Sequence, residues 1–363
     1  MSDLAILALS SFKERGESVE KYIRERRKTP SKKYLIDLTQ TRFSNGEAKI
    51  MLNESVRDKD VYILADVCNY GCTYTMFGSE NRMSPDDHFQ DIKRAVSAAS
   101  WRANRITVIM PFLYAGRQHR RMGRESLDCA IALQELEKMG VDRIITFDAH
   151  DPNIINAVPL SAFDNMTPIS AIMTKFIEDS KNPVDDSNTI VISPDYGAMG
   201  RSVKVATVLG LPVGIVYKRR DYSKVVRGKN PILGFAYTGP SVKGKSAIIV
   251  DDMIASGGSI LEVASYLKKQ GVGEITIFTS FALFNDGTAE FDRLHKEGII
   301  KKVYATNLSY VSAELKDKEW FERVNLTKEI AEMIDILNTH GSVGRFINDF
   351  SAVEMAKAKW NRG

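Results

Sequence analysis

The 363-residue sequence is short of cysteine and has no long apolar run. Its three cysteines, Cys68, Cys72 and Cys129, do not stand at zinc-ligand spacing with histidines, which argues against a zinc site. No stretch of about 18 apolar residues could span a membrane, and the apolar residues 1–11 lack the basic flank and cleavage site of a signal peptide. We therefore expect a reduced cytoplasmic protein without membrane contact.

The excess of positive charge is also small. The net charge is +4, from 50 basic and 46 acidic residues, so the total gives no reason to expect a nucleic-acid partner. Basic residues gather at 21–33 and at 117–124. The first stretch has the charge spacing of a solvated helix face. The second has arginines suited to phosphate oxygens, but it lacks the interleaved aromatic residues of a nucleic-acid surface.

The sequence is rich in short apolar runs that alternate with helical patterns. Runs of Ile and Val bounded by turn residues are typical of strands buried on both faces of a parallel sheet. We expect strands near 1–11, 61–65, 106–110, 144–147, 190–193, 213–217, 247–250, 275–279 and 302–305, and helices near 88–100, 126–139, 168–178, 198–209 and 259–270. This alternation indicates an α/β fold.

The alternation occurs twice, which predicts two α/β domains of similar build. A loop-like stretch with two prolines at 158–168 separates the two sets of strands. We expect an N-terminal domain over 1–163 and a C-terminal domain over 164–363, with the last residues as candidates for packing on the N-terminal domain. Residues 68–87 and 180–187 have mixed polar composition, and we expect a long loop and a short linker there.

The strongest functional pattern lies at 247–259, which reads Ala-Ile-Ile-Val-Asp-Asp-Met-Ile-Ala-Ser-Gly-Gly-Ser. Four apolar residues predict a buried strand, and a helix follows the Ser-Gly-Gly-Ser turn. Ligands of parallel sheets bind beyond the carboxyl ends of the strands. The free N–H groups of a helix start, with Gly257 and Gly258 allowing close approach, suit a phosphate.

The carboxylates of Asp251 and Asp252 would repel a phosphate, so they suit sugar hydroxyls or hydrated magnesium. The alternative is a strand–turn–helix in which the glycines serve only the turn. The pattern is not a Walker A loop, because it has no Gly-Lys-Ser/Thr, and it is not a dinucleotide fingerprint.

This segment resembles the phosphoribosyl pyrophosphate (PRPP) motif shared by type I phosphoribosyltransferases and ribose-phosphate pyrophosphokinases. Other segments are similar to the second family alone and occur in its order. They are Phe43-Ser-Asn-Gly-Glu47, Tyr114-Ala-Gly-Arg-Gln118, Asp148-Ala-His150, Ser193-Pro-Asp195 and Lys218-Arg-Arg220. The resemblance covers roughly residues 40–350. It implies two domains of the type I phosphoribosyltransferase kind, each a mostly parallel sheet flanked by helices.

The resemblance implies a reaction in which Mg-ATP gives its pyrophosphoryl group to the 1-hydroxyl of ribose 5-phosphate, forming PRPP and AMP for nucleotide biosynthesis. Magnesium is the implied cofactor, and a homo-oligomer built from dimers, with a hexamer as the larger form, is the implied assembly. The implied residues are Phe43, Asn45, Gly46, Glu47, Arg117 and Gln118 for ATP; Asp251, Asp252, Ala255, Ser256, Gly257, Gly258 and Ser259 for ribose 5-phosphate; His150 and Asp195 for the metal; and Lys218 and Arg220 for catalysis.

Lys218 and Arg220 follow a predicted strand at i and i+2, so an extended chain would point both cations the same way. A solvated basic turn is the alternative. Phe43 as an ordinary core residue and His150 as a structural histidine are alternatives as well.

Several positions depart from the family pattern. Gly116 is an insertion, His119 and Ala255 each replace an aspartate, and the segment 68–87 is longer than its counterpart. Two other functions therefore stay open, a non-catalytic regulatory homologue and a type I phosphoribosyltransferase. Lys218 and Arg220 argue against the first, and Phe43–Glu47 and the basic loop argue against the second.

Overall fold

The computed structural model describes residues 3–180, 183–220, 223 and 232–360, without the side chains of Arg220, Ile232 and Trp360. The chain forms two compact units. Unit 1 consists of Met1–Pro168, Asn307–Ser312 and Asn325–Asp349, and unit 2 consists of Ile169–Thr306, Ala313–Val324 and Phe350–Gly363.

Unit 1 is built on a five-stranded parallel sheet in the order β1-β4-β7-β8-β9. The strands are β1 (Leu4–Ala8), β4 (Asp60–Leu64), β7 (Arg105–Ile109), β8 (Arg143–Phe147) and β9 (Ala162–Met166). All five residues of β4 are buried, as expected for a strand inside a parallel sheet covered on both faces.

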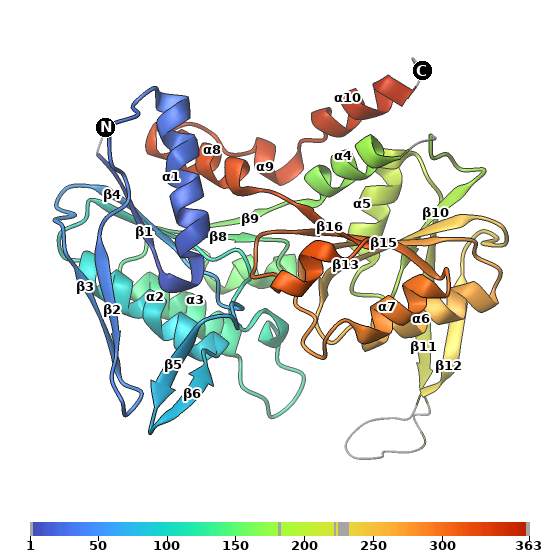
Figure 1. Cartoon of the computed structure of the whole chain (residues 1–363), viewed down its shortest axis with the longest axis horizontal. Helices are drawn as coiled ribbons and strands as arrows, with labels where there is room; N and C mark the ends of the chain where they lie inside the picture. Colours follow the sequence, from blue (N-terminus) through green and yellow to red (C-terminus); the bar gives the residue numbers. More distant parts are fainter. Residues whose placement is uncertain (1–2, 181–182, 221–222, 224–231, 361–363) are drawn as a thin grey trace. The chain divides into compact units, whose positions relative to one another are not determined.

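Helices and two hairpins surround this sheet (Figure 1). Apolar side chains of α2 and α3 join one core with alternate residues of the strands, such as Leu7, Ile63 and Val108, and α1 packs against α8. The elements are α1 (Lys13–Arg27), α2 (Pro85–Ala99), α3 (Asp128–Lys138), α8 (Thr327–Asn338), α9 (Arg345–Asn348), the short turns η1 (Ser10–Phe12), η2 (Gly116–Gln118) and η3 (Pro152–Ala157), and the hairpins β2–β3 (Leu38–Arg42, Ala48–Leu52) and β5–β6 (Thr73–Met76, Ser79–Arg82).

Unit 2 is built on a seven-stranded sheet in the order β12-β11-β10-β13-β14-β15-β16. Every neighbouring pair is parallel except β11–β12, which is an antiparallel hairpin at the edge. The strands are β10 (Thr189–Ser193), β11 (Val213–Arg220), β12 (Ile232–Thr238), β13 (Ser246–Ile254), β14 (Ile275–Ala282), β15 (Ile300–Thr306) and β16 (Phe321–Val324).

Helices cover both faces of this second sheet (Figure 1). One face packs on α4, α5 and α10, with Val191, Val250 and Phe278 from the strands in the same core. The helices and turn of unit 2 are α4 (Ile169–Asp179), α5 (Met199–Leu209), α6 (Gly258–Lys269), α7 (Ala289–Lys296), η4 (Ala313–Asp317) and α10 (Ser351–Trp360). The expected α/β class, with mostly parallel sheets flanked by helices, is confirmed.

The prediction of a loop at 158–168 is wrong, because this stretch contains the edge strand β9. Only Phe163 and Met166 of that strand are buried, so its sequence does not carry the continuous apolar run of a central strand. The domain boundary expected at 163/164 falls inside β9, whereas the compact units change at 168/169. The stretch Asn325–Asp349 belongs to unit 1, and the last residues, Phe350–Gly363, belong to unit 2.

The long loop expected at 68–87 is also wrong in its middle, where the β5–β6 hairpin forms. Its strands carry mostly exposed polar residues, and a hairpin held by main-chain bonds leaves little apolar signal in the sequence. Among the described residues, no helix combines the length and the apolar character that a membrane crossing requires.

Candidate active site

The Asp-Asp segment of unit 2 lies inside a strand. β13 continues to Ile254, and Asp251 pairs with Thr279 of β14. The expected strand 247–250 is therefore too short, because main-chain pairing with β14 extends past the apolar run. The loop between strand and helix is limited to Ala255, Ser256 and Gly257.

Of the two acidic residues in this segment, one is buried and the other is partly buried. Asp252 is buried, and the carboxylate of Asp251 accepts a hydrogen bond from the Asp252 N–H at 2.9 Å. Burial raises the pKa of Asp251 well above its usual range, and the nearby carboxyls of Asp252 and Asp195 raise it further. Asp195, which follows β10, is thus close enough to Asp251 for their charges to interact.

Arg201 of α5 supplies a positive charge that the sequence reading missed. Its Nη2 lies 3.9 Å from Asp252 Oδ2, and its side chain is mostly buried. Nothing in the local sequence predicts this pairing, because the two residues meet only through the packing of α5 beside β13.

Helix α6 begins at the end of the loop, and its first turn is open to a ligand. Gly257, the residue before the helix, has φ +86°, and no side chain among the described residues caps this end. Ser256, Gly258 and Ser259 are exposed. The first N–H groups of a helix have no partner within it, and together with the helix dipole they form a binding place for an anion.

The two glycines of this loop have different roles. A Cβ added at Gly257 would lie 2.6 Å from the Phe291 ring, so the positive φ and the packing on Phe291 both require glycine there. At Gly258 the nearest atom to an added Cβ is Ser256 Oγ, at 3.9 Å. The space beside Gly258 is therefore open, and this position is the one where a ligand could approach the backbone closely.

The predicted catalytic lysine lies in β11, which is longer than expected and includes Lys218, Arg219 and Arg220. Lys218 Nζ forms an ion pair with Glu262 Oε2 of α6 at 3.0 Å. A register shift between Arg219 and Arg220 interrupts the simple alternation of side chains. The side chain of Arg220 lies outside the described part of the chain, so its joint action with Lys218 stays a prediction.

The predicted metal residue of unit 2, Asp195, also forms a structural hydrogen bond. Its Oδ1 accepts a hydrogen bond from the Ala198 N–H at 2.9 Å, next to the start of α5. This contact fixes the carboxylate at the end of β10, where a ligand of the sheet would bind.

The predicted ATP segment of unit 1 is the turn of the β2–β3 hairpin. The Phe43 N–H donates to Glu47 O at 2.7 Å, and the Asn45 side chain bonds both the backbone and the carboxylate of Glu47. Gly46 has φ +90° in this turn. Phe43 is 44% exposed, which rules out its alternative role as an ordinary core residue.

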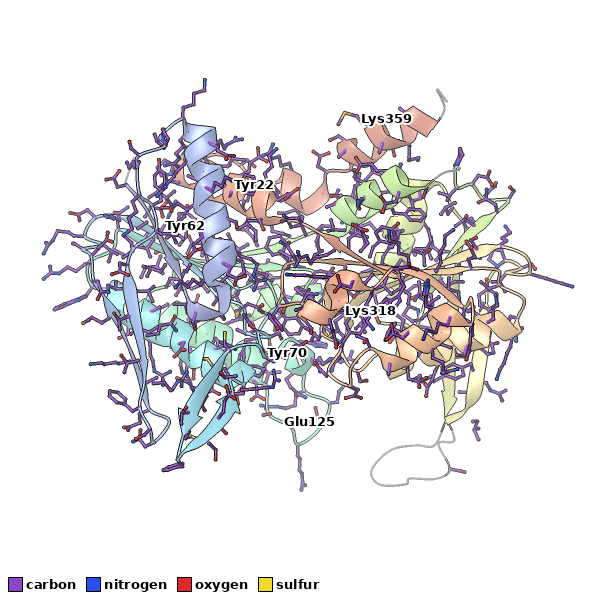
Figure 2. All side chains as sticks on the ribbon, viewed as in Figure 1. Tyr22, Tyr62, Tyr70, Glu125, Lys318 and Lys359 are labelled. Carbon is purple, nitrogen blue, oxygen red and sulfur yellow. The ribbon has the colours of Figure 1, made fainter. Side chains whose placement is uncertain are left out.

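Arg117 and Gln118 stand in the short turn η2, after Ala115 with φ +54°. Both are exposed, as is Glu125 further along the same loop, which is labelled in Figure 2. His119, which departs from the family pattern, is held in place. Its Nδ1 bonds Gly116 O at 3.0 Å, and its Nε2 lies 3.2 Å from Asp151 Oδ2.

The predicted metal residue of unit 1, His150, is exposed beyond the end of β8. Its ring centroid lies 5.5 Å from that of His119. Asp148, two residues earlier, has φ +43°, a strained backbone for a non-glycine residue. Such strain at a strand end fits a place where the chain is shaped for a ligand.

The described residues contain no cluster of three or more His, Cys, Asp or Glu side chains arranged to encircle a metal ion. Magnesium keeps several waters and is usually held by one or two carboxylates together with substrate phosphates. The carboxylate of Asp195, fixed at the end of β10 by the Ala198 N–H, fits that kind of site, which needs only one or two protein carboxylates.

Comparison with known proteins places these segments in one family. The family model for the N-terminal domain of ribose phosphate pyrophosphokinase matches residues 4–140, and the phosphoribosyl transferase domain matches residues 161–318. The chain is 29% identical to the ribose-phosphate pyrophosphokinase of Vibrio parahaemolyticus over 86% of its own length and 91% of that protein. For the enzyme of the same name from Mycoplasma genitalium, the identity is 28% over 80% and 81% of the two chains.

A solved structure supports the fold. The phosphoribosylpyrophosphate synthetase of Mycobacterium smegmatis superposes with a TM-score of 0.75, covering 93% of this chain and 100% of that chain at 24% identity. The two domain matches follow each other in the order of a complete pyrophosphokinase, and the relatives of that name span most of the sequence. The chain therefore belongs to the ribose-phosphate pyrophosphokinase family.

Proposed function

We propose that this chain transfers the pyrophosphoryl group of Mg-ATP to the 1-hydroxyl of ribose 5-phosphate, giving PRPP and AMP. The observation that carries the proposal is the open first turn of α6 directly after the Asp251–Asp252 strand. It offers N–H groups and serine hydroxyls for the 5-phosphate, while carboxylates stand where sugar hydroxyls would lie. A Walker-type site does not explain this segment, because the loop before α6 has no Gly-Lys-Ser/Thr.

Positioning and charge neutralisation are what this kind of transfer mainly requires. In this proposal, Asp251 and Asp252 hold the ribose hydroxyls, and residues 255–259 hold the 5-phosphate. Lys218 and Arg220 neutralise charge that develops between the β-phosphorus and its leaving oxygen. When bound, magnesium would supply further charge neutralisation at the phosphate oxygens.

The remaining predicted residues serve ATP. Phe43 offers an exposed aromatic face to the adenine ring, with Asn45, Gly46 and Glu47 shaping the turn. Arg117 and Gln118 lie on an exposed loop whose arginine can contact phosphate oxygens. His150 and Asp195 are proposed as magnesium ligands, each within its own unit. Cytoplasmic location and a dimer-based homo-oligomer are part of the same proposal.

The two alternatives fit less well. A type I phosphoribosyltransferase would not need the N-terminal domain that residues 4–140 match. A non-catalytic regulatory homologue would not need a lysine beside the sugar-phosphate helix, where Lys218 pairs with Glu262.

One assay tests the proposal against both alternatives. The full-length protein is incubated with ATP, ribose 5-phosphate and magnesium, and AMP and PRPP are measured with and without inorganic phosphate. We expect equal amounts of AMP and PRPP, and no product when ribose 5-phosphate is omitted. Absence of AMP under every condition would support the non-catalytic regulatory homologue. Consumption of PRPP in the presence of a free base would indicate a type I phosphoribosyltransferase.

A further inference from the structure

The segment 68–87, which the sequence left without a function, forms a hairpin that contacts the predicted adenine-binding turn. Both hairpins belong to unit 1, and in Figure 1 the tips of β2–β3 and β5–β6 lie side by side. The Phe77 N–H donates a hydrogen bond of 2.9 Å to Ser44 O, so the tip of one hairpin is tied to the turn of the other.

Two side-chain contacts strengthen this junction. Met76 stands over Gly46, because a Cβ added at Gly46 would lie 2.7 Å from Met76 Sδ. The guanidinium of Arg42 lies 4.8 Å from the centre of the Tyr74 ring. The same guanidinium pairs with Asp91 of α2 at 3.1 Å, so the turn that carries Phe43 is held from both sides.

The turn at the tip of β5–β6 contains a residue type, phenylalanine, that rarely adopts the backbone conformation found there. Met76 pairs with Ser79, which leaves Phe77 and Gly78 as a two-residue turn with φ +48° and +79°. Turns of this shape favour Asn-Gly or Asp-Gly, and a phenylalanine at positive φ is sterically strained. Phe77 is also 79% exposed, so burial does not compensate. Backbone strain of this kind is a reason to look for a function.

We propose that Phe77 is a second aromatic contact for the base of ATP, next to Phe43. This inference rests on the proposed function and adds a base-binding residue to it. Phe43 is 44% exposed and Phe77 is 79% exposed, on turns joined through Ser44. A purine has a large π-face, and stacking on an aromatic side chain stabilises a bound base. Because a main-chain hydrogen bond joins the two turns, the proposal places both exposed rings against the same base.

Two substitutions of Phe77 separate binding from turn structure. Phe77→Asn removes the ring and supplies the residue that the turn prefers, so the melting temperature should stay level or rise. Phe77→Tyr keeps the ring. Titration calorimetry with Mg-ATP, without ribose 5-phosphate, should show affinity about tenfold weaker in Phe77→Asn and near wild type in Phe77→Tyr. The affinity for ribose 5-phosphate should not change in either variant.

Trp101 offers a matched control, because it is 78% exposed and lies in the same unit. Trp101→Ala should bind Mg-ATP like wild type. If Phe43→Ala weakens ATP binding and Phe77→Asn does not, the inference is wrong while the proposed function stands. If neither variant weakens it, the adenine assignment of residues 43–47 fails as well. A changed oligomeric state with unchanged ATP affinity in Phe77→Asn would make Phe77 a contact between copies and overturn the inference.

Discussion

The ammonium of Lys218 lies 3.0 Å from the carboxylate of Glu262, on the helix whose first turn is proposed to hold the sugar phosphate. The side chain of Lys218 is mostly buried, while that of Glu262 is half exposed. The ion pair therefore keeps the lysine near the open end of α6 and away from solvent. A polyphosphate that arrived there would compete with Glu262 for the same cation.

Lys218→Ala should lower turnover by about 10²-fold or more, because one charged contact in the transition state is lost. Binding of ribose 5-phosphate should persist, since the first turn of α6 is the proposed site of the phosphate. AMP release and calorimetry measure the two effects. Lys301, which forms an exposed ion pair with Glu274, provides the control Lys301→Ala. Near wild-type turnover in Lys218→Ala would remove this residue from catalysis.

Gly258→Ala should weaken ribose 5-phosphate binding without destabilising the free protein. Apart from its chain neighbours and its own helix backbone, an added Cβ has no atom nearer than 3.9 Å, but it would stand where the phosphate is proposed to approach. Gly257→Ala should instead lower the stability of the free protein by about 1–3 kcal/mol, through positive φ and the clash with Phe291.

Denaturant unfolding and calorimetry on both variants separate these effects. If Gly258→Ala bound ribose 5-phosphate as tightly as wild type, the loop would be a structural turn.

His150→Ala and Asp195→Ala should each raise the magnesium concentration needed for half-maximal activity. Each removes a proposed ligand, so the metal–nucleotide complex should weaken more than sugar binding does. Activity is measured against magnesium at fixed ATP, and ribose 5-phosphate affinity is measured separately. His340→Asn changes another exposed histidine and should leave the midpoint unchanged. Unchanged midpoints in both alanine variants would exclude both residues from magnesium binding.

Alkaline pH should reduce the stability of unit 1 through Cys129. Burial in the core raises the pKa of this thiol from 9.0 to about 12. Between these values the unfolded chain loses the proton while the folded protein keeps it. The folded state therefore binds more protons, and each pH unit lowers the free energy of unfolding by about 1.4 kcal/mol. The contribution is fully present below pH 9 and is lost toward pH 12.

Denaturant unfolding of wild type and Cys129→Ala between pH 8 and pH 10.5 checks this expectation. The variant loses some packing at every pH, but its stability should fall less steeply with pH. Parallel slopes for the two proteins would mean that the Cys129 thiol ionises as easily in the folded protein as in the unfolded chain.

The local sequence determined the class of the fold and the place of the strand–turn–helix that we propose as the sugar-phosphate loop. Runs such as 247–250 are apolar throughout because both faces of a parallel strand are covered. This need for apolar side chains can be read directly from the sequence of the strand. A Ser-Gly-Gly-Ser turn after such a run likewise predicts an anion-binding site from the local sequence alone, since helix N–H groups and small residues suffice to bind an anion. Family membership followed from motifs of the same local kind.

Only the tertiary structure decided which distant groups meet. Buried Asp66 accepts hydrogen bonds from Arg15, from the Ser309 hydroxyl and from the Tyr310 N–H. The sequence near Asp66 does not predict these partners. The pairing of Lys218 with Glu262 and the support of the Phe43 turn by Phe77 have the same character. Polar and hairpin contacts depend on how elements pack, and they leave no periodic pattern in the sequence, so they became visible only when the chain was folded.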